Sequence, residues 1–471
     1  MASATWSVSG LPAGVTPQKD WVTGVVLHSD LPTTGTFASS SAKLNQLQSN
    51  ITWGWRSNSV DIPTDCPQRD ERMGWTGDAE VFCATAMLNT DALAFWKSWL
   101  QSMREEQEAD GAIPDIVPNA SKGFKARSPG WMDAATVIPW EVYVRTGDAS
   151  VLAENFEMME KLVGWYRAQS VDGLLPKIGG YGDWLQPYPQ QKAKNWMGYR
   201  RGDTPVSLLG GAFYARSARI LADSARVLGR SDEAKRYGEE ADTVRAAFVK
   251  AYFDTEGKLQ NAPETQTAYV LAIAFDLLPP ELKAKAGENL VRLVKAADDH
   301  LRTGFLGTPF IAQALDETGH SDVAATLLFQ ETYPSWFYPI NQGATTMWER
   351  WNSYTRDKGF GDVEMNSFNH YAYGAIGQWM VERVAGLAPD PAQAGYRHFF
   401  IRPLVSPQLD SARATLKTPY GTASSAWTKK AGEIAMDIVV PPNATATVQL
   451  PDQSAPQTVS AGKYHFVTKL K

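Results

Sequence analysis

The chain has 471 residues, of which 44% are hydrophobic and 20% are charged, and its formal net charge is −6. This composition is typical of a soluble globular protein and excludes a disordered chain. No cluster of lysine and arginine suits a phosphate backbone and no apolar run is long enough to cross a bilayer, so neither nucleic acid nor a membrane is an expected partner.

Residues 1–35 are predicted to be extended and rich in turns. The segment 21–28 (WVTGVVLH) has the composition of a β-strand, and the segment 31–36 (LPTTGT) is typical of a linker. We therefore expect this region to be the end of a preceding β module.

Residues 36–385 have helical periodicity and are predicted to form the largest domain. In the first helix, apolar side chains spaced three or four residues apart share one face: Leu44, Leu47, Ile51 and Trp55. Further helices are predicted at 76–88, 91–108, 132–146, 149–168, 205–228, 231–253, 264–275, 280–298, 308–318, 320–330 and 366–385. About a dozen helices in antiparallel pairs indicate a mainly α fold, an (α/α)6 barrel with six inner and six outer helices.

Long loops rich in Gly, Pro, Trp and Asp separate alternate helices. They are predicted at 57–75, 109–130, 171–203, 299–307 and 333–365. Loops of this length in a compact domain usually carry function, and alternation places them at one end of the barrel.

Residues 386–471 change to short β-type segments separated by Pro and Gly turns. The expected strands are 399–403, 412–416, 423–427, 434–440 and 444–450. They predict a smaller C-terminal antiparallel β-sandwich packed on the barrel.

The two cysteines, Cys66 and Cys83, offer no disulfide framework and no CxxC zinc site, although a single bridge between them stays open. We expect no metal and no other cofactor. The first residues lack the basic and apolar segments of a signal peptide, which leaves cytoplasm, periplasm and secretion open. The oligomeric state is likewise undetermined.

The densest polar segment is 65–78 (DCPQRDERMGWTGD). A structural interpretation makes Thr76 a helix N-cap, with Asp78 and Glu80 near the positive end of the helix dipole. It leaves three carboxylates and two arginines unexplained: Asp65, Asp70, Glu71, Arg69 and Arg72. The functional interpretation is that crowded acids beside Trp75 raise the pKa of one carboxyl, so that it can protonate a glycosidic oxygen. Cation binding by an acidic loop is a further alternative.

A second candidate carboxylate is Glu349, within the aromatic segment 343–351 (GATTMWERW). A glycosidase uses two carboxyl groups, and an inverting one holds them roughly 6.5–9.5 Å apart so that water fits between base and sugar. The structural alternative is an ion pair of Glu349 with Arg350 or Arg356 at a loop edge.

Two shorter motifs place a tryptophan close to an aspartate in the predicted loops: 130–133 (GWMD) and 182–184 (GDW). A ring that stacks on a sugar face near a carboxylate for its hydroxyls suits saccharide binding, although such rings more often fill a core. His370, in the segment 366–374 (NSFNHYAYG), is placed at the start of the last inner helix, where a lone histidine is commonly structural.

Together, and in this order, these segments resemble the bacterial α-L-rhamnosidases of glycoside hydrolase family 78. The resemblance covers roughly residues 15–471, and it implies Glu71 as general acid and Glu349 as general base of an inverting hydrolysis of terminal α-L-rhamnose. The positions that match rhamnose-binding residues of the family are Asp65, Arg69, Trp75, Asp78, Trp131, Trp184 and His370. Asp70, Asp133 and Asp183 are plausible neighbours of these.

The sequence departs from the family at its N-terminus, where members usually carry further β-sandwich modules. Two other classes of function stay open. The first is another enzyme on a helical barrel, such as a glucosidase, a trehalase-like enzyme or a polysaccharide lyase. The second is a catalytically silent rhamnose-binding protein, against which the presence of both carboxylates argues.

Overall fold

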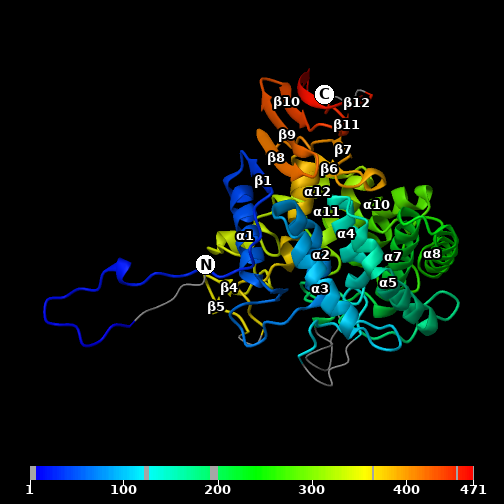
Figure 1. The fold of residues 1–471 in the computed structure, drawn as a ribbon, viewed down its shortest axis with the longest axis horizontal. Helices are drawn as coiled ribbons and strands as arrows, with labels where there is room; N and C mark the ends of the chain where they lie inside the picture. Colours follow the sequence, from blue (N-terminus) through cyan, green and yellow to red (C-terminus); the bar gives the residue numbers. More distant parts are fainter. Residues whose placement is uncertain (1–6, 121–126, 191–199, 363–364, 452–454, 470–471) are drawn as a thin grey trace.

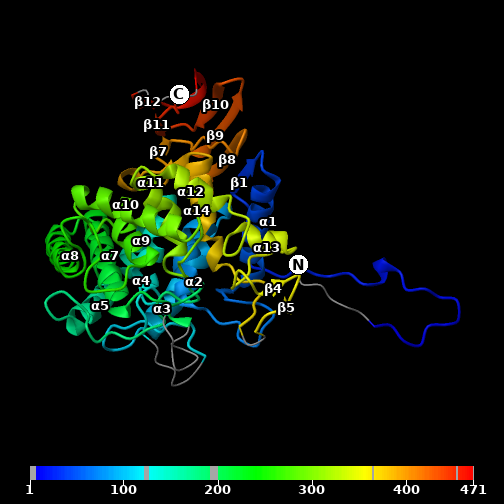
Figure 2. The same cartoon turned by 180° about the vertical axis from the view of Figure 1, so that it is seen from behind.

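The computed structural model describes residues 7–120, 127–190, 200–362, 365–451 and 455–469 (Figure 1). A barrel of helices forms the body of the molecule, and a β module lies on one end of it, as Figure 2 shows from behind.

Six helical segments line the inside of the barrel. They are α2 (Thr76–Asn89), α4 (Ala134–Thr146), α7 (Val206–Val227), α9 (Gln266–Ala274), α11 (Ile311–Glu317), and a last segment made of η3 (Ala372–Ala375), α14 (Ile376–Trp379) and the π-helical turn η4 (Met380–Val384). Each contacts the next around the ring, and α14 contacts α2, which closes it. Every residue of α2 is buried, as expected for a helix that is surrounded by others.

The outer helices are α1 (Ala42–Asn58), α3 (Leu93–Glu106), α5 (Ser150–Gln169), α8 (Ser231–Tyr252), α10 (Pro280–Ala296) and α12 (Ser321–Leu328). They are amphipathic. In α3, for example, Phe95, Trp96 and Trp99 are buried while Gln101 and Glu105 face solvent. The predicted barrel of six helical hairpins is thereby confirmed.

The helix boundaries differ from the prediction in three places. The last inner segment begins at Ala372, so His370 precedes it. The helix predicted from 308 starts as a 3-10 turn, η2 (Thr308–Phe310), which contains Pro309. A short helix, α13 (Phe337–Asn341), lies in the segment that was predicted to be a loop.

The β module contains two sheets. One has the order β1-β8-β9-β10-β13 and is antiparallel, and the other has the order β12-β11-β7-β6. In the second sheet β11 pairs with β7 in parallel, so the module is mixed rather than purely antiparallel. The strands are β1 (Gly35–Ser39), β6 (Leu387–Pro389), β7 (His398–Ile401), β8 (Ser411–Thr418), β9 (Gly421–Lys430), β10 (Glu433–Val440), β11 (Thr445–Val448), β12 (Gln457–Val459) and β13 (Gly462–Lys469). Two-stranded ribbons in the barrel loops add β2 (Ser59–Val60) with β3 (Ile62–Pro63), and β4 (Tyr354–Thr355) with β5 (Gly359–Phe360).

The β module is attached to the end of the last inner segment. Trp427 Nε1 donates to the carbonyl oxygen of Val384 (2.9 Å), and Ser425 Oγ donates to that of Ala385 (2.7 Å). Strand β1 reaches this module from the other end of the sequence and pairs with β8. We propose domain boundaries at 36–385 and 386–471, with β1 contributed across the boundary.

The predicted strand at 21–28 is wrong for the described structure. Between residues 7 and 34 the only regular element is a 3-10 turn, η1 (Lys19–Trp21), and Val25 and Leu27 are 78% and 75% exposed. In Figure 1 this dark blue segment runs outward from the barrel. A strand needs a partner for its backbone groups, and no described strand lies beside it.

Among the described residues, no helix combines the length and the apolar character that crossing a bilayer requires.

Candidate active site

The predicted functional residues gather at one mouth of the barrel. Helices alternate in direction around the ring, so all six inner segments run the same way and the loops that precede them open at one end. The loop before α2 carries Glu71, the loop before α4 carries Trp131, the loop before α7 carries Trp184, and the loop before η3 carries Glu349 and His370.

Arg69 links the two candidate catalytic carboxylates. Its Nη1 lies 2.8 Å from Glu349 Oε2, and its Nη2 lies 2.5 Å from Glu71 Oε2 and 3.3 Å from Asp65 Oδ2. The two glutamates are 278 positions apart in sequence but lie within reach of one guanidinium. A planar fork of donors is suited to orient two carboxylates at once.

Glu71 accepts a second interaction from the neighbouring ring. Trp75 Nε1 donates to Glu71 Oε1 at 2.8 Å. Trp75 is also the residue before α2, whereas Thr76, predicted to be the N-cap, is the first helical residue and donates to the carbonyl oxygen of Asp115. Glu80 is buried farther along α2, 3.8 Å from Arg216.

Asp65 holds the loop and faces the site at the same time. Its Oδ1 accepts from the backbone N–H of Met73 at 2.9 Å, and its Oδ2 contacts Arg69. Burial and the negative charge of Glu71 raise the pKa of Asp65 to about 7, although His370 opposes this. The predicted raised pKa in this acidic segment therefore occurs at Asp65.

Glu349 is 4% exposed and belongs to a loop that is tied to the segment around Asp65. Its backbone N–H donates to the carbonyl oxygen of Ser367 (3.0 Å), and Gln68 Nε2 donates to Ser367 Oγ (3.0 Å). Burial raises the pKa of Glu349, while His370 and Arg69 lower it. Its ion-pair partner is thus Arg69, not the predicted alternatives Arg350 or Arg356.

His370 forms a buried ion pair with the first turn of α2. Its Nε2 lies 2.9 Å from Asp78 Oδ1, and both side chains are nearly inaccessible. Burial lowers the pKa of His370, but Asp78, Glu349 and Asp65 together raise it to about 9. The imidazole is therefore a fixed positive charge beside the carboxylates at neutral pH.

Four aromatic rings form one wall of the site, with Tyr181 at their centre. Its ring centroid lies 5.5 Å from that of Trp75, 5.0 Å from Trp131 and 5.6 Å from Trp184. The Tyr181 hydroxyl is buried and has no hydrogen-bond partner among the described residues. Tyr181 was missed by the sequence analysis, and its position among three glycines beside Asp183 and Trp184 was the available signal.

Asp70, by contrast, points away from the site. Its side chain is fully exposed and lies 3.4 Å from Arg72. The structure therefore does not bring Asp70 together with the other candidate residues.

Comparison with known proteins agrees with this arrangement. The family model for the bacterial alpha-L-rhamnosidase 6 hairpin glycosidase domain matches residues 32–384. The chain belongs to the bacterial α-L-rhamnosidase family. The family's C-terminal domain matches residues 386–465.

Individual members of the family are similar over most of this chain. An alpha-L-rhamnosidase of Formosa agariphila is 52% identical over 448 residues, which are 95% of this chain and 47% of the relative. The structure of the Streptomyces avermitilis α-L-rhamnosidase complexed with L-rhamnose has a TM-score of 0.87 at 40% identity, covering 94% of this chain and 43% of that one. The Aspergillus terreus enzyme has a TM-score of 0.90 at 34% identity, covering 97% and 52%. The chain spans about half the length of these relatives.

Two aspartates of this rhamnosidase-family chain hold loops of the barrel in place through hydrogen bonds. Both Asp133 and Asp183 are completely buried. Asp133 accepts from the backbone N–H of Gly130 (2.8 Å) and from the hydroxyls of Tyr166 (2.7 Å) and Ser217 (2.6 Å). These donors fix the loop that carries Trp131. The predicted contact of Asp133 with the sugar is therefore not what the geometry supports.

Asp183 anchors a different loop of the rhamnosidase barrel. Its carboxylate accepts from the backbone N–H groups of Gly304 (2.7 Å), Leu306 (2.9 Å) and Gly307 (3.1 Å) and from the Thr267 hydroxyl. Between these donors, the Phe305 ring packs 5.4 Å from that of His370. Asp183 thus positions the wall beside His370 instead of facing the sugar as predicted.

Replacing Asp183 with asparagine is expected to destabilise the chain by about 3 kcal/mol, because an amide group would face two donors that now share one carboxylate oxygen. Urea unfolding followed by circular dichroism measures this change. Asp70→Asn, an identical replacement at an exposed side chain, is the control and should stay within about 0.5 kcal/mol of wild type. A loss below about 1 kcal/mol for Asp183→Asn would show that the anchor is not important.

The pH dependence of stability should report the ion pair of His370. A histidine whose pKa is raised in the folded chain stabilises it fully below pH 6.5, and this contribution is lost as the pH rises through about 9. The difference in unfolding free energy between wild type and His370→Gln should therefore shrink by about 3 kcal/mol over this window. Unfolding in urea at a series of pH values measures it. The corresponding difference for His465→Gln, at an exposed histidine on β13, should vary by less than about 1 kcal/mol.

A cation is a poor fit for the acidic segment of this family member. Ligand atoms of Asp65, Cys66 and Glu71 lie within 4.8 Å of one another. However, burial raises the pKa of the Cys66 thiol far above neutral, and the positively charged Arg69 already contacts both carboxylates, where it would repel a cation. The residues present therefore favour sugar chemistry over metal binding.

Proposed function

We propose that this chain hydrolyses terminal, non-reducing α-L-rhamnosides with inversion at the anomeric carbon. The observation that carries the proposal is the pair of carboxylates, Glu71 and Glu349, that Arg69 joins across the barrel mouth. The ring cluster around Tyr181 supplies a surface on which an apolar sugar face can stack. The names of the relatives, and the L-rhamnose in the Streptomyces avermitilis structure, support rhamnose as the sugar.

Glu349 would act as the general base. It would take a proton from a water molecule, whose oxygen attacks the anomeric carbon from the face opposite the leaving group. Burial raises the pKa of Glu349, which makes the carboxylate a better proton acceptor near neutral pH. The bond from the anomeric carbon to the glycosidic oxygen breaks in the same step.

Glu71 would act as the general acid and give its proton to the departing glycosidic oxygen. In the free site its carboxyl is held by Arg69 and Trp75. We expect a bound rhamnoside to separate Arg69 from Glu71, so that the carboxyl is protonated when the bond breaks. Arg69 would then keep Asp65 and Glu349 in place.

The remaining residues would bind the sugar and balance charge. Asp65 and Asp78 offer carboxylate oxygens to hydroxyl groups, and Trp75, Trp131 and Trp184 offer ring faces and edges. His370, positively charged beside Asp78 and Glu349, would keep the base ionised between catalytic cycles.

The direct test is the hydrolysis of 4-nitrophenyl α-L-rhamnoside, with the anomer of the released sugar followed by NMR. Release of 4-nitrophenol with β-rhamnose formed first is the expected result. First formation of α-rhamnose would contradict the inverting pair, and an unsaturated product that absorbs in the ultraviolet would indicate a lyase. Saturable rhamnose binding without turnover by the folded chain would indicate a binding protein.

A further inference from the structure

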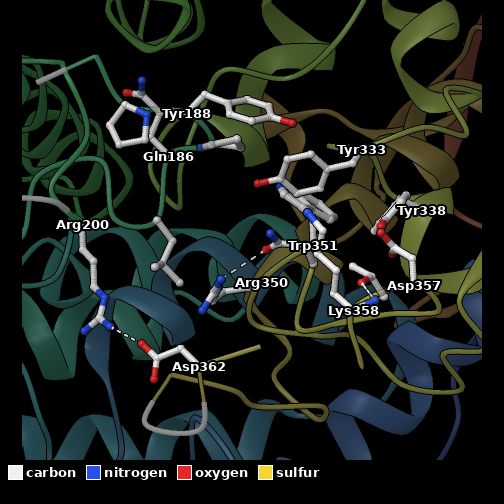
Figure 3. A pocket seen from close by; sticks show the side chains of 15 residues that line it. Gln186, Tyr188, Arg200, Tyr333, Tyr338, Arg350, Trp351, Asp357, Lys358 and Asp362 are labelled. Carbon is white, nitrogen blue, oxygen red and sulfur yellow. Dashed lines mark hydrogen bonds and ion pairs between the residues drawn. The ribbon is translucent and has the colours of Figure 1, made fainter. Parts of the chain in front are cut away.

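A second cavity lies beside the candidate active site. It has a volume of about 590 Å³ and is lined by residues 185–189 and Arg200 on one side and by residues of the segment 333–362 on the other (Figure 3). Three tyrosines line it, together with Trp351 and polar side chains: Tyr188, Tyr333, Tyr338, Gln186 and Asn352. Aromatic rings mixed with a few polar groups are typical of a site for a small polar ligand such as a sugar.

This cavity shares a wall with the catalytic carboxylates. Trp351 lines the cavity and stacks on Tyr373, with ring centroids 4.2 Å apart. Tyr373 packs on Phe305 (5.0 Å), which packs on His370 (5.4 Å) in the site itself. Glu349 is two residues before Trp351, and Trp184 directly precedes Leu185 of the lining. A series of packed rings thus connects the lining of the cavity to His370 in the site.

The charges of the lining are not balanced. Arg200 is paired with Asp362 at 3.0 Å. Asp357 is next to Lys358 in sequence, and its pKa is lowered chiefly by a hydrogen bond with Thr355 and to a smaller extent by the charge of Lys358. Arg350 remains. Its side chain donates a 3.4 Å hydrogen bond to Asn352 Oδ1 and forms no ion pair with any described residue.

We propose that this cavity binds the leaving-group sugar and selects one that carries an anionic group, a carboxylate or a sulfate ester, which Arg350 binds. The inference rests on the proposed function, because a terminal rhamnose has one glycosidic neighbour, and the lining of this cavity adjoins Glu349 and Trp184, where that neighbour would extend. A half-buried guanidinium without a carboxylate partner is suited to bind a planar or tetrahedral anion through two parallel hydrogen bonds. Tyr188 and Tyr333, whose centroids are 5.2 Å apart, would border the sugar ring.

Binding outside the rhamnose site should act mainly through kcat/KM. Contacts between the cavity and the leaving group add binding free energy that stabilises the transition state relative to the free enzyme and substrate. A hydrogen-bonded charge pair at a half-buried site should raise kcat/KM for the anionic substrate about 10- to 100-fold over that for its neutral counterpart. Salt should reduce this preference, because ions screen a partly exposed pair.

The test compares three rhamnosides linked through the same hydroxyl of glucuronic acid, of glucose and of a sulfated glucose, with 4-nitrophenyl α-L-rhamnoside as the reference. We expect kcat/KM for an anionic substrate to exceed that for the glucoside about tenfold or more. A preference limited to glucuronate assigns the cavity to carboxylates, and one limited to the sulfated sugar assigns it to sulfate esters. Turnover of the reference without any anionic preference overturns the inference and leaves the proposed function intact. Absence of turnover on all four substrates contradicts both.

Variants of Arg350 assign the preference to its guanidinium. Arg350→Met should lower the ratio of anionic to neutral kcat/KM toward one, and Arg350→Lys should restore part of it. Arg356→Met is the matched control, because Arg356 is exposed on the same loop and does not line the cavity. Thermal unfolding of each variant checks the fold. An unchanged ratio in folded Arg350→Met, or an equal fall in Arg356→Met, would contradict the role of Arg350.

Discussion

Glu349→Gln is expected to reduce kcat/KM about 10³- to 10⁴-fold on every α-L-rhamnoside, whatever the leaving group. The amide cannot accept a proton from water, and this step is required however easily the glycosidic bond breaks. Steady-state kinetics on 4-nitrophenyl α-L-rhamnoside and on an alkyl rhamnoside measure the effect. Because Arg69 retains Asp65 and Glu71 as partners, the substitution should leave the fold intact, which circular dichroism checks.

Azide provides an independent test of the base. In Glu349→Ala a small anion has room on the face where water is activated, and it needs no deprotonation. Addition of azide should restore turnover and give β-rhamnosyl azide, the inverted product. Substantial turnover by Glu349→Gln without azide, or an α-rhamnosyl azide, would mean that another group has this role.

The barrel could be predicted because its helices are long and have a clear hydrophobic period. Outer helices such as α3 carry one apolar stripe, and inner helices such as α2 are buried all round, so their positions follow from local sequence. Strand β1 could not be predicted in this way. Its sequence, GTFAS, resembles a turn, and it becomes a strand by pairing with β8, more than 370 residues away. The segment 21–28 shows the reverse case, strand-like in composition but without a partner.

The types of residue in the site could be predicted from the sequence, but the hydrogen-bond and ion-pair partners of their polar groups could not. Asp133 and Asp183 stand close to tryptophans in sequence, yet their carboxylates accept hydrogen bonds from Ser217 and Gly304, which come from distant parts of the chain. Arg69 was matched to a sugar-binding position, and only the structure shows that it contacts both catalytic candidates. Sequence spacing contains no information about such contacts between loops of a closed ring.

The same limit applies to protonation. Crowding of acids predicts that one carboxyl has a raised pKa, and burial, which the sequence does not give, decides which one. Among the carboxyls that contact Arg69, burial raises the pKa of Asp65 and of Glu349. The chemical assignment of acid and base therefore depends on kinetics that distinguish proton donation from proton removal.

Glu71→Gln should provide that distinction through the leaving group. A good leaving group such as 4-nitrophenolate departs without a proton, so kcat/KM for 4-nitrophenyl α-L-rhamnoside should fall less than about tenfold. An alkyl or sugar leaving group needs the proton, and its kcat/KM should fall about 10²- to 10⁴-fold. The logarithm of the rate of Glu71→Gln should therefore depend more steeply on the leaving group's pKa than that of wild type.

The matched control for this effect is Trp75→Phe. It keeps an aromatic ring beside Glu71 but removes the N–H that now donates to Glu71 Oε1. If Glu71 is the acid, Trp75→Phe should slow poor and good leaving groups by similar factors, because proton donation remains. Equal losses on both classes of substrate in Glu71→Gln would instead show that Glu71 orients the sugar through Arg69, and the acid would have to be sought among the other carboxyls at the barrel mouth, with Asp65 first.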